Sequence, residues 1–194
     1  MSASGHSRFA TLHDVELCSH AAVGERAAFG ELVRRHGSSV RGVLRRMGAA
    51  PAEADDVAQD AFLTAFERIA EFRGEGTFAA WVKKIAARLY LRRLQREKKL
   101  GALAVEAADE ETRPQRSDAD AAIDLDGALK ALGATERLCV TMCFGAGLSH
   151  TEAAEALNLP LGTVKSHVKR GLDKLRTRLA PGDGVVLEGR RGNG

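Results

Sequence analysis

Residues 149–176 decide the fold of the second half of the chain, and they read SHTEAAEALNLPLGTVKSHVKRGLDKLR. Ser149 and Glu152 have the spacing of a capping box, in which each side chain satisfies a backbone N–H at the start of a helix. Asn158 follows, and asparagine adopts the left-handed conformation of a tight turn with little penalty. The stretch therefore predicts a short helix from Ser149, a turn, and a second helix over 161–179, which together form a helix-turn-helix.

The second helix of this motif has an apolar side and a cationic side. Its apolar residues recur at three- and four-residue intervals and form a seam that seats the helix on its own domain: Val164, Val168, Leu172, Leu175 and Leu179. The residues that face away from this seam are Lys165, Ser166, Lys169, Arg170 and Asp173. A helix seated in this way presents Lys and Arg where the major groove of DNA would lie. An ordinary solvated face is the simpler alternative, but the capping box, turn and seam together favour nucleic acid.

Upstream of the motif, apolar spacing and the positions of Gly and Pro predict further helices. These helices are expected at 25–47 with a bend or break near Gly37, at 51–71, from a cap at Thr77 to Lys99, at 123–132, and at 135–146 with Thr135 as its cap. No stretch shows the alternation of apolar and polar residues that is typical of a strand. The predicted fold class is therefore all-α.

Charge is segregated along the chain, although the net charge is only +3 from 29 basic and 26 acidic residues among 194. Eight basic residues and one acid lie in 81–99, eight acids and two arginines in 104–126, and six basic residues and one acid in 163–178. The acidic stretch has few large apolar groups, so burial does not offset the entropy that it would lose on ordering. We therefore expect two small helical domains joined by a flexible acidic linker. The expected segments are a flexible N-terminus at 1–20, a first domain at 21–99, the linker at 100–122, a second domain at 123–180 and a disordered tail at 181–194.

Composition excludes some classes of protein. No stretch approaches the roughly 18 uninterrupted apolar residues that a membrane helix needs. The N-terminus lacks the basic-then-apolar order of a signal peptide. Three cysteines without regular spacing fit a reducing compartment better than a disulfide scaffold. We expect a cytoplasmic protein with no membrane insertion.

Cys139 and Cys143 lie four residues apart on one helical face, with His150 nearby in the sequence. This spacing is compatible with metal or redox sensing, but free cysteine is also among the most buried small residues. Two ligands do not make a closed zinc site. We therefore expect no metal and no other cofactor.

In the first half of the chain, Asp56, Gln59 and Asp60 share a helical face that the apolar stripe of their helix leaves open. Exposed carboxylates at this spacing have nothing to raise the pKa of one of them, so acid–base catalysis is disfavoured. A solvated face and a docking surface for a basic helical partner both remain open.

Phe72, Phe78 and Trp81 bracket a glycine loop that leads into the basic stretch of 81–99. Aromatic rings between Lys and Arg suit single-stranded or melted nucleic acid, where bases stack or enter a pocket while cations hold the phosphates. Structural packing of Trp81 beneath the basic helix is an equal alternative.

Two longer strings carry a resemblance to a known family. Residues 54–86, ADDVAQDAFLTAFERIAEFRGEGTFAAWVKKIA, resemble domain two of bacterial sigma factors of the extracytoplasmic-function (ECF) group within the sigma-70 family. Residues 129–176, from LKALGATERL to the end of the helix-turn-helix, resemble domain four. The resemblance covers about 21–99 and 123–179. It implies a factor that is not an enzyme, binds core RNA polymerase, recognises the −35 and −10 promoter elements and promotes strand opening.

The same resemblance assigns roles to residues. It implies that core polymerase, through its largest subunit, is bound by Asp56, Gln59 and Asp60. It implies that the −10 element is contacted by Arg73, Thr77, Phe78, Trp81, Lys84, Arg88, Arg92 and Arg93. It implies that the −35 element is contacted by Thr163, Lys165, Ser166, His167, Lys169 and Arg170. The implied partners are the largest and second-largest subunits of core polymerase, promoter DNA, and an anti-sigma factor between the two domains.

The chain departs from the family at Arg88 and Arg92, where relatives usually have Asn and Asp, so the −10 base preference of relatives does not carry over. Two other functions are compatible with parts of the sequence. A stand-alone DNA-binding regulator would use the same helix-turn-helix but would leave the face around Asp56 without a role. An enzyme acting on nucleic acid through Asp55, Asp56 and Asp60 would need a metal or a base within reach, and no His or Cys cluster surrounds these acids.

Overall fold

The computed structural model describes residues 8–104 and 125–179, and within these ranges every regular element is helical, as the sequence predicts. The first range contains α2 (Asp14–Ala22), α3 (Arg26–Met47), α4 (Pro51–Glu67), the 3-10 turn η1 (Ile69–Glu71) and α5 (Phe78–Ala104). The second contains α6 (Leu125–Lys130), α7 (Ala134–Val140), the π-turn η2 (Thr141–Gly145), α8 (His150–Leu157) and α9 (Leu161–Leu179). The predicted tail, and the predicted linker beyond Ala104, lie outside the described residues.

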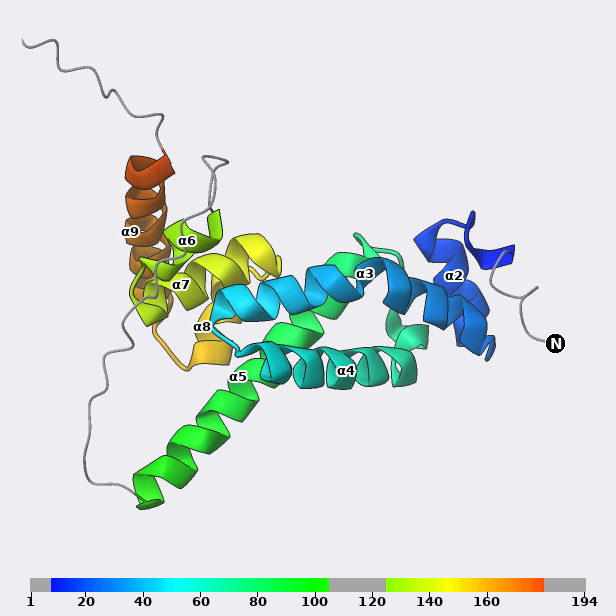
Figure 1. Cartoon of the computed structure of the whole chain (residues 1–194), viewed down its shortest axis with the longest axis horizontal. Helices are drawn as coiled ribbons and strands as arrows, with labels where there is room; N and C mark the ends of the chain where they lie inside the picture. Colours follow the sequence, from blue (N-terminus) through cyan, green and yellow to red (C-terminus); the bar gives the residue numbers. More distant parts are fainter. Residues whose placement is uncertain (1–7, 105–124, 180–194) are drawn as a thin grey trace, which may run out of the picture.

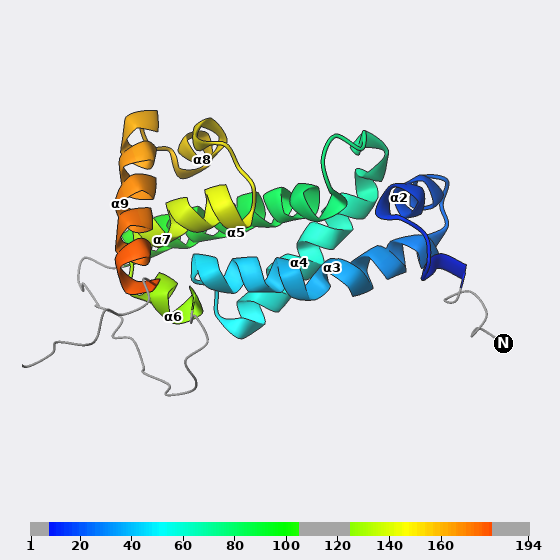
Figure 2. The same cartoon turned by 90° about the horizontal axis from the view of Figure 1, so that it is seen from above.

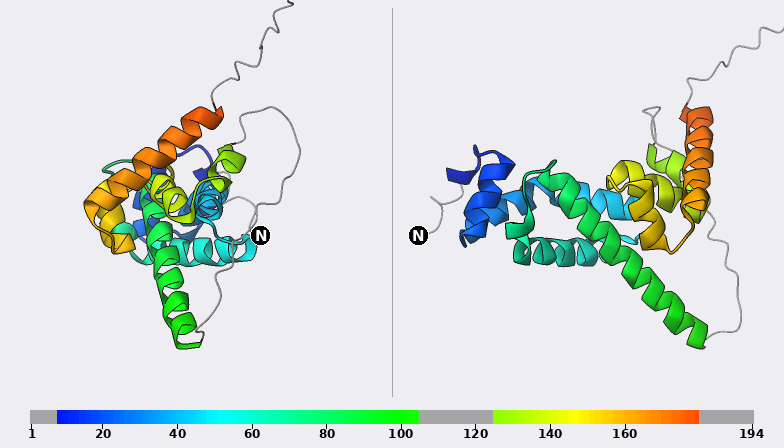
Figure 3. Two further views of the ribbon diagram at one scale, coloured as in Figure 1. Left: turned by 90° about the vertical axis from the view of Figure 1, so that its left-hand side faces the viewer. Right: turned by 180° about the vertical axis from the view of Figure 1, so that it is seen from behind.

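α3, α4 and α5 form the core of the first half, and α2 lies across one end of α3 (Figures 1 and 2). The ring of Phe78 is only 1% exposed at the start of α5. Its centroid lies 6.2 Å from that of Phe29, 6.0 Å from that of Phe72 and 5.9 Å from that of Trp81. This aromatic cluster fixes the start of α5 against α3 and the glycine loop. The C-terminal turns of α5 project away from the other helices (Figures 1 and 3).

Helix boundaries in the first half follow local signals in most places. The side chain of Thr77 accepts a hydrogen bond of 3.2 Å from the backbone N–H of Ala80, so it caps α5 as predicted. Gly74 and Gly76 have φ of +74° and +90°, which explains the glycines of the loop. The predicted break at Gly37 is wrong. α3 runs through it because Gly37 is buried, and burial along α3 outweighs the roughly 1 kcal/mol that glycine costs inside a helix.

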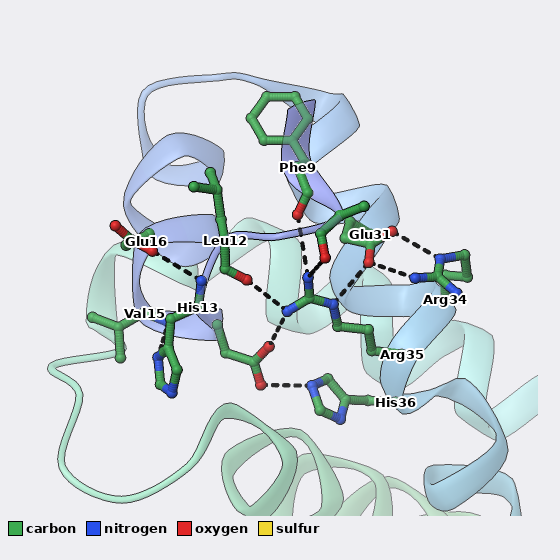
Figure 4. Close-up of polar contacts among 11 residues, drawn as sticks. Phe9, Leu12, His13, Val15, Glu16, Glu31, Arg34, Arg35 and His36 are labelled. Atoms are coloured by element: carbon green, nitrogen blue, oxygen red, sulfur yellow. Dashed lines mark hydrogen bonds and ion pairs between the residues drawn. The ribbon is translucent and has the colours of Figure 1, made fainter. Parts of the chain in front are cut away.

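The N-terminal segment is folded onto α3 from Arg8 onward, contrary to the flexible N-terminus expected over 1–20 (Figure 4). The guanidinium of Arg35 holds it. Its nitrogens donate to the carbonyl oxygens of Phe9, Ala10 and Leu12 at 3.2, 2.9 and 2.8 Å, and to the Asp14 carboxylate at 3.0 Å. These contacts join residues more than twenty positions apart, so helical periodicity does not reveal them.

The second half is built around the helix-turn-helix. Ser149 and Glu152 form the predicted capping box, and Asn158 has φ 53° and ψ 45° in the turn. α9 begins and ends where the sequence predicts. Thr135 is not the cap of its helix; Gly133 is the N-cap of α7, and its N–H donates to the Glu136 side chain at 3.4 Å.

The two halves pack against each other along α3 and α5. One apolar cluster runs through both halves, from Phe78 and Val82 to Met142 and Val164. η2 contacts both α3 and α5, and α7 contacts α3 (Figure 2). The DNA-facing elements proposed from the sequence therefore lie in one packed molecule.

Candidate nucleic-acid and polymerase interfaces

α9 presents a cationic outer surface because its apolar seam is buried. Val164, Val168, Gly171 and Leu175 are buried against the rest of the second half, and Leu172 and Leu179 pack at the edge. Lys165, Ser166, Lys169 and Arg170 are exposed, while Thr163 and His167 are half-buried. All six residues proposed for the −35 element thus lie in the first half of α9. The predicted seating of this helix is confirmed.

Glu136 on α7 is a site residue that sequence reasoning missed. Its carboxylate accepts a 2.7 Å hydrogen bond from Lys174 and lies 3.7 Å from the guanidinium of Arg170. The Lys174 hydrogen bond is the main reason that the pKa of Glu136 is lowered. The residue is 8% exposed and anchors the cationic helix to its own domain. The sequence did carry one signal for it: Glu136 follows Gly133 with the Gly-x-x-Glu spacing of a capping residue at the start of a helix.

The glycine loop and the start of α5 place the aromatic residues unequally. Arg73 and Thr77 are exposed, and Trp81 is half-buried with its ring centroid 5.5 Å from that of Phe72. Phe78 was predicted to contact the −10 element, but its ring is buried in the core and does not reach the surface. Its large apolar ring is excluded from water and packs against the buried side of Trp81, with the two ring centroids 5.9 Å apart.

The four cations proposed on α5 divide between two sides. Lys84 and Arg88 face α8, where their nitrogens lie 3.3 and 3.0 Å from the Glu152 carboxylate. Arg93 instead lies 3.5 Å from Glu53 of α4 and 3.2 Å from Glu97. Arg92 is exposed and lines a groove between α5 and α8. The structure therefore brings Lys84, Arg88 and Arg92 together and turns Arg93 toward the start of α4.

The α4 face around Asp56, Gln59 and Asp60 is exposed, as predicted from the apolar stripe on its other side. Leu63 continues this face one turn later with 55% of its surface exposed, and sequence reasoning missed it. The available signal was an apolar residue outside the stripe of its own helix. Beside the face, α3 and α4 enclose an apolar groove of about 580 Å³, lined by Phe29, Val33, Phe62, Leu63 and Phe66 with Asp55 and Gln59 at its rim.

The cysteine thiols are protonated in this fold. Burial raises the pKa of Cys139 to about 11 and that of Cys18 to about 12, and it also raises the pKa of Cys143. Redox sensing needs a thiolate, so the environment disfavours that role. Over residues 8–104 and 125–179, no group of three His, Cys, Asp or Glu side chains is placed to hold a metal ion. No helix in the same ranges is long and apolar enough to cross a membrane.

Comparison with known families decides between the alternatives. The sigma-70 region 2 family matches residues 32–100, and the sigma-70 region 4 family matches residues 128–177. CnrH of Cupriavidus metallidurans, an RNA polymerase sigma factor, is 31% identical over 177 residues, which cover 84% of this chain and 92% of CnrH. The ECF sigma factor SigE of Mycolicibacterium smegmatis is 31% identical over 172 residues, which cover 82% of this chain and 65% of SigE.

The chain belongs to the ECF sigma factors of the sigma-70 family. As a sigma factor it directs RNA polymerase to promoters for transcription initiation and is itself non-catalytic. Its general partners are core RNA polymerase and promoter DNA. The region 4 match contains the helix-turn-helix, so the prediction that this motif binds DNA agrees with the family.

Solved structures show the same fold. CnrH in complex with the cytosolic domain of CnrY matches with a TM-score of 0.51 and 27% identity, over 86% of this sigma factor and 96% of CnrH. The sigma factor RpoE in complex with the anti-sigma factor NepR, from Bartonella quintana, matches with a TM-score of 0.52 and 20% identity. The second match covers 77% of this sigma factor and 94% of RpoE, and it supports the fold alone.

Proposed function

We propose that this sigma factor reads the −35 element with the outer surface of α9, reads and opens the −10 element with the glycine loop and α5, and docks on core polymerase through α4. The observation that carries the proposal is the cationic outer surface of α9, which four exposed side chains form over a buried seam: Lys165, Ser166, Lys169 and Arg170. Such a helix enters the major groove with its N-terminal residues on base edges.

On the −35 duplex, Lys165 and Lys169 supply salt-dependent phosphate contacts. Ser166 donates its hydroxyl proton to the Gly162 carbonyl at 2.9 Å, so its oxygen is left to accept from a base or a backbone group. Arg170 is held 3.1 Å from His167 Nδ1 and near Glu136, which fixes the direction of its guanidinium. Side chains that are already fixed lose less conformational entropy on binding, and this favours sequence-specific contacts over non-specific electrostatic binding.

On the −10 element, Trp81, Arg73 and Thr77 form the reading surface, and Phe78 supports it from the core. A base that is extruded from the non-template strand stacks on or beside Trp81. Holding that base offsets the few kcal/mol that unstacking costs. Lys84, Arg88 and Arg92 hold the neighbouring phosphates.

Docking on core polymerase makes these two modest contacts strong. Asp56, Gln59, Asp60 and Leu63 form a face with carboxylates and one apolar anchor, which suits a basic helical surface of the largest subunit. The helix-turn-helix half makes a second contact with polymerase, on its second-largest subunit. Once both halves are tethered, the second DNA contact is effectively intramolecular, so affinities multiply without further contacts.

We place this activity in the cytoplasm, where core polymerase and promoter DNA meet. We also propose an anti-sigma partner that binds between the two halves, because RpoE of the NepR complex is solved with one and CnrH with the cytosolic domain of CnrY.

Co-elution with core polymerase, together with DNA binding in its presence and absence, tests the proposed function. We expect the full chain to co-elute with core polymerase and to bind promoter duplex specifically only in that complex. Tight, specific duplex binding by the free chain without co-elution would instead establish a stand-alone regulator.

A further inference from the structure

A further aromatic ring joins the cluster around Trp81, and it comes from α3. The imidazole centroid of His36 lies 5.7 Å from the ring centroid of Phe78, with the two ring planes 49° apart. Phe78 is 1% exposed, and its centroid lies 5.9 Å from that of Trp81. A single buried ring thus separates His36 from Trp81. Because packed interiors leave little free space, a displacement of the imidazole would be passed on to Trp81.

Asp14 fixes the orientation of this imidazole. Its Oδ2 lies 2.7 Å from His36 Nε2, and its Oδ1 accepts from Arg35 Nη1 at 3.0 Å (Figure 4). A carboxylate accepts, so Nε2 is the nitrogen that carries the proton. The side chains of His36 and Asp14 are only 18% and 22% exposed. The Asp14 backbone is itself fixed, because it begins α2 directly after the N-cap His13, which forms a capping box with Glu16.

The glycine loop that precedes Phe78 depends on supports at its two ends. Residues 73–77 are all exposed, and a Cβ on either loop glycine would meet nothing within 4 Å. At the N-terminal end of the loop, η1 packs against α2, and Ile69 of η1 is buried (Figure 2). At the C-terminal end, the loop runs into Phe78 and so onto the ring of His36. The helix α2 therefore supports one end of the loop directly and the other end through Asp14.

We propose that Asp14 and His36 are positioning residues for the −10 reading surface. Asp14 orients the imidazole, the imidazole holds Phe78, and Phe78 sets the place of Trp81 before DNA arrives. A site whose side chains are already held by packing and by supporting hydrogen bonds loses less entropy when it binds. The −10 role of Trp81 rests on the proposed function, whereas the contacts that hold its ring do not depend on that function.

His36→Ala removes both the hydrogen bond and the ring, and His20→Ala is its matched control. His20 is also a half-buried histidine that contacts a carboxylate and an aromatic ring. Its Nδ1 lies 3.1 Å from Glu25 Oε1, and its ring centroid lies 5.6 Å from that of Phe9. Neither partner is one of the rings packed around Trp81 in the described part of the chain.

His36→Phe is a second variant at the same position, for the case in which alanine prevents folding. It keeps an aromatic ring against Phe78 and removes the hydrogen bond to Asp14, which still has Arg35 as a partner. Thermal unfolding followed by circular dichroism gives the temperature range in which every variant is folded. All the measurements below are made within that range.

The first readout is the fluorescence emission of the free full-length chain, since Trp81 is its only tryptophan. We expect His36→Ala to shift the emission maximum, because the indole then has a rearranged and more hydrated environment. His36→Phe should shift it less, and His20→Ala should leave it at the wild-type wavelength. Wild-type emission from both His36 variants, or an equal shift in His20→Ala, would overturn the positioning role.

The second readout is binding of single-stranded DNA by the complex with core polymerase. The probe is the labelled oligonucleotide that the wild-type complex enriches most from a pool with a short randomised stretch, and fluorescence anisotropy measures its affinity. His36→Ala should weaken binding by about two- to tenfold, the range for the loss of one aromatic pair, and His36→Phe should recover part of this loss. His20→Ala should bind like the wild type. Unchanged affinity in His36→Ala would contradict the proposal.

A double-mutant cycle with Trp81→Ala separates positioning from a general effect on stability. If His36 acts through Trp81, His36→Ala should cause no further loss of binding in the Trp81→Ala background. Fully additive losses would overturn the proposal. Unchanged binding by Trp81→Ala alone would instead reject the −10 role of Trp81, and with it the use of the pair in DNA reading. The emission of the free chain would still show whether His36 holds Trp81, so the two failures are distinguishable.

Discussion

At the scale of single residues, buried carboxylates organise the cationic side chains of this sigma factor. Glu31 is 7% exposed and accepts hydrogen bonds from Arg34 and Arg35 at 2.6 and 2.8 Å (Figure 4). Arg35 in turn holds the N-terminal segment, and Glu136 performs the corresponding task for Lys174 on α9. Glu31 and its two arginines are close in the sequence, but the contacts of Arg35 with the N-terminal segment and of Glu136 with Lys174 join distant residues, so the sequence does not reveal them.

Glu31→Gln should destabilise the fold by about 1–3 kcal/mol at pH 7, because it leaves the half-buried Arg35 with Asp14 alone as a charged acceptor. The Arg34 hydrogen bond and then that of Arg35 lower the pKa of Glu31 from 4.5 to about 2. A pKa lowered by folding means that the stabilisation is complete above about 4.5 and is lost as the pH falls toward 2. Urea unfolding at pH 7, 4.5 and 3 should therefore show a difference between wild type and variant that shrinks with acid. A difference independent of pH would contradict the role of the Glu31 charge.

Lys169→Ala should weaken binding of the polymerase complex to −35 duplex and lower the slope of log affinity against log salt by about one. Arg178→Ala, at the exposed end of the same helix, serves as the control and should leave the slope unchanged. Fluorescence anisotropy at several salt concentrations measures both. An unaltered slope for Lys169→Ala would remove this residue from phosphate contact.

At the scale of elements, the sequence predicts best the helices whose ends are marked by capping and turn residues close by in the chain. The helix-turn-helix is predicted almost to the residue, because Ser149, Glu152 and Asn158 act within one or two turns. The break at Gly37 is wrong because tertiary burial overrides a local preference, and α2 is missed because a long-range Arg35 contact folds it. The buried side of α9 is predicted from its apolar seam. How closely α9 crosses α7 is not predictable from the sequence and appears only in the structure.

Gly171→Ala should destabilise the second half, since a Cβ there would lie 2.6 Å from Val140 Cγ2 where α9 crosses α7. We expect a loss of about 1–3 kcal/mol from this overpacking. Gly162→Ala on the same helix is the control, because a Cβ there meets nothing within 4 Å. Alanine at an open helical position should be neutral or stabilising. Equal unfolding midpoints for the two variants would show that the crossing is not tight.

Asp56→Lys combined with Asp60→Lys should abolish co-elution with core polymerase while leaving the far-ultraviolet circular dichroism spectrum intact, because both side chains are exposed on α4. The reversed charges would repel the basic partner surface. Glu75→Lys combined with Glu155→Lys makes the same change of charge on exposed residues away from α4 and should retain binding. Wild-type retention of polymerase by the α4 variant would refute this docking face.

At the scale of the whole molecule, the segregated charge predicts two cationic readers, and the family matches agree with one region in each half. It does not predict how the halves pack. That packing depends on side-chain geometry, such as the insertion of Arg137 beside Gly48 and the position of Glu152 between two cations.

Run-off transcription on pooled genomic fragments, with the 5′ ends of the transcripts sequenced, tests the central claim most directly. Core polymerase with this sigma factor should start at a defined set of sites that share sequence blocks near −35 and −10. Core polymerase alone should not use these sites, and Lys169→Ala should reduce their use. Transcripts that are the same with and without the chain would contradict the account.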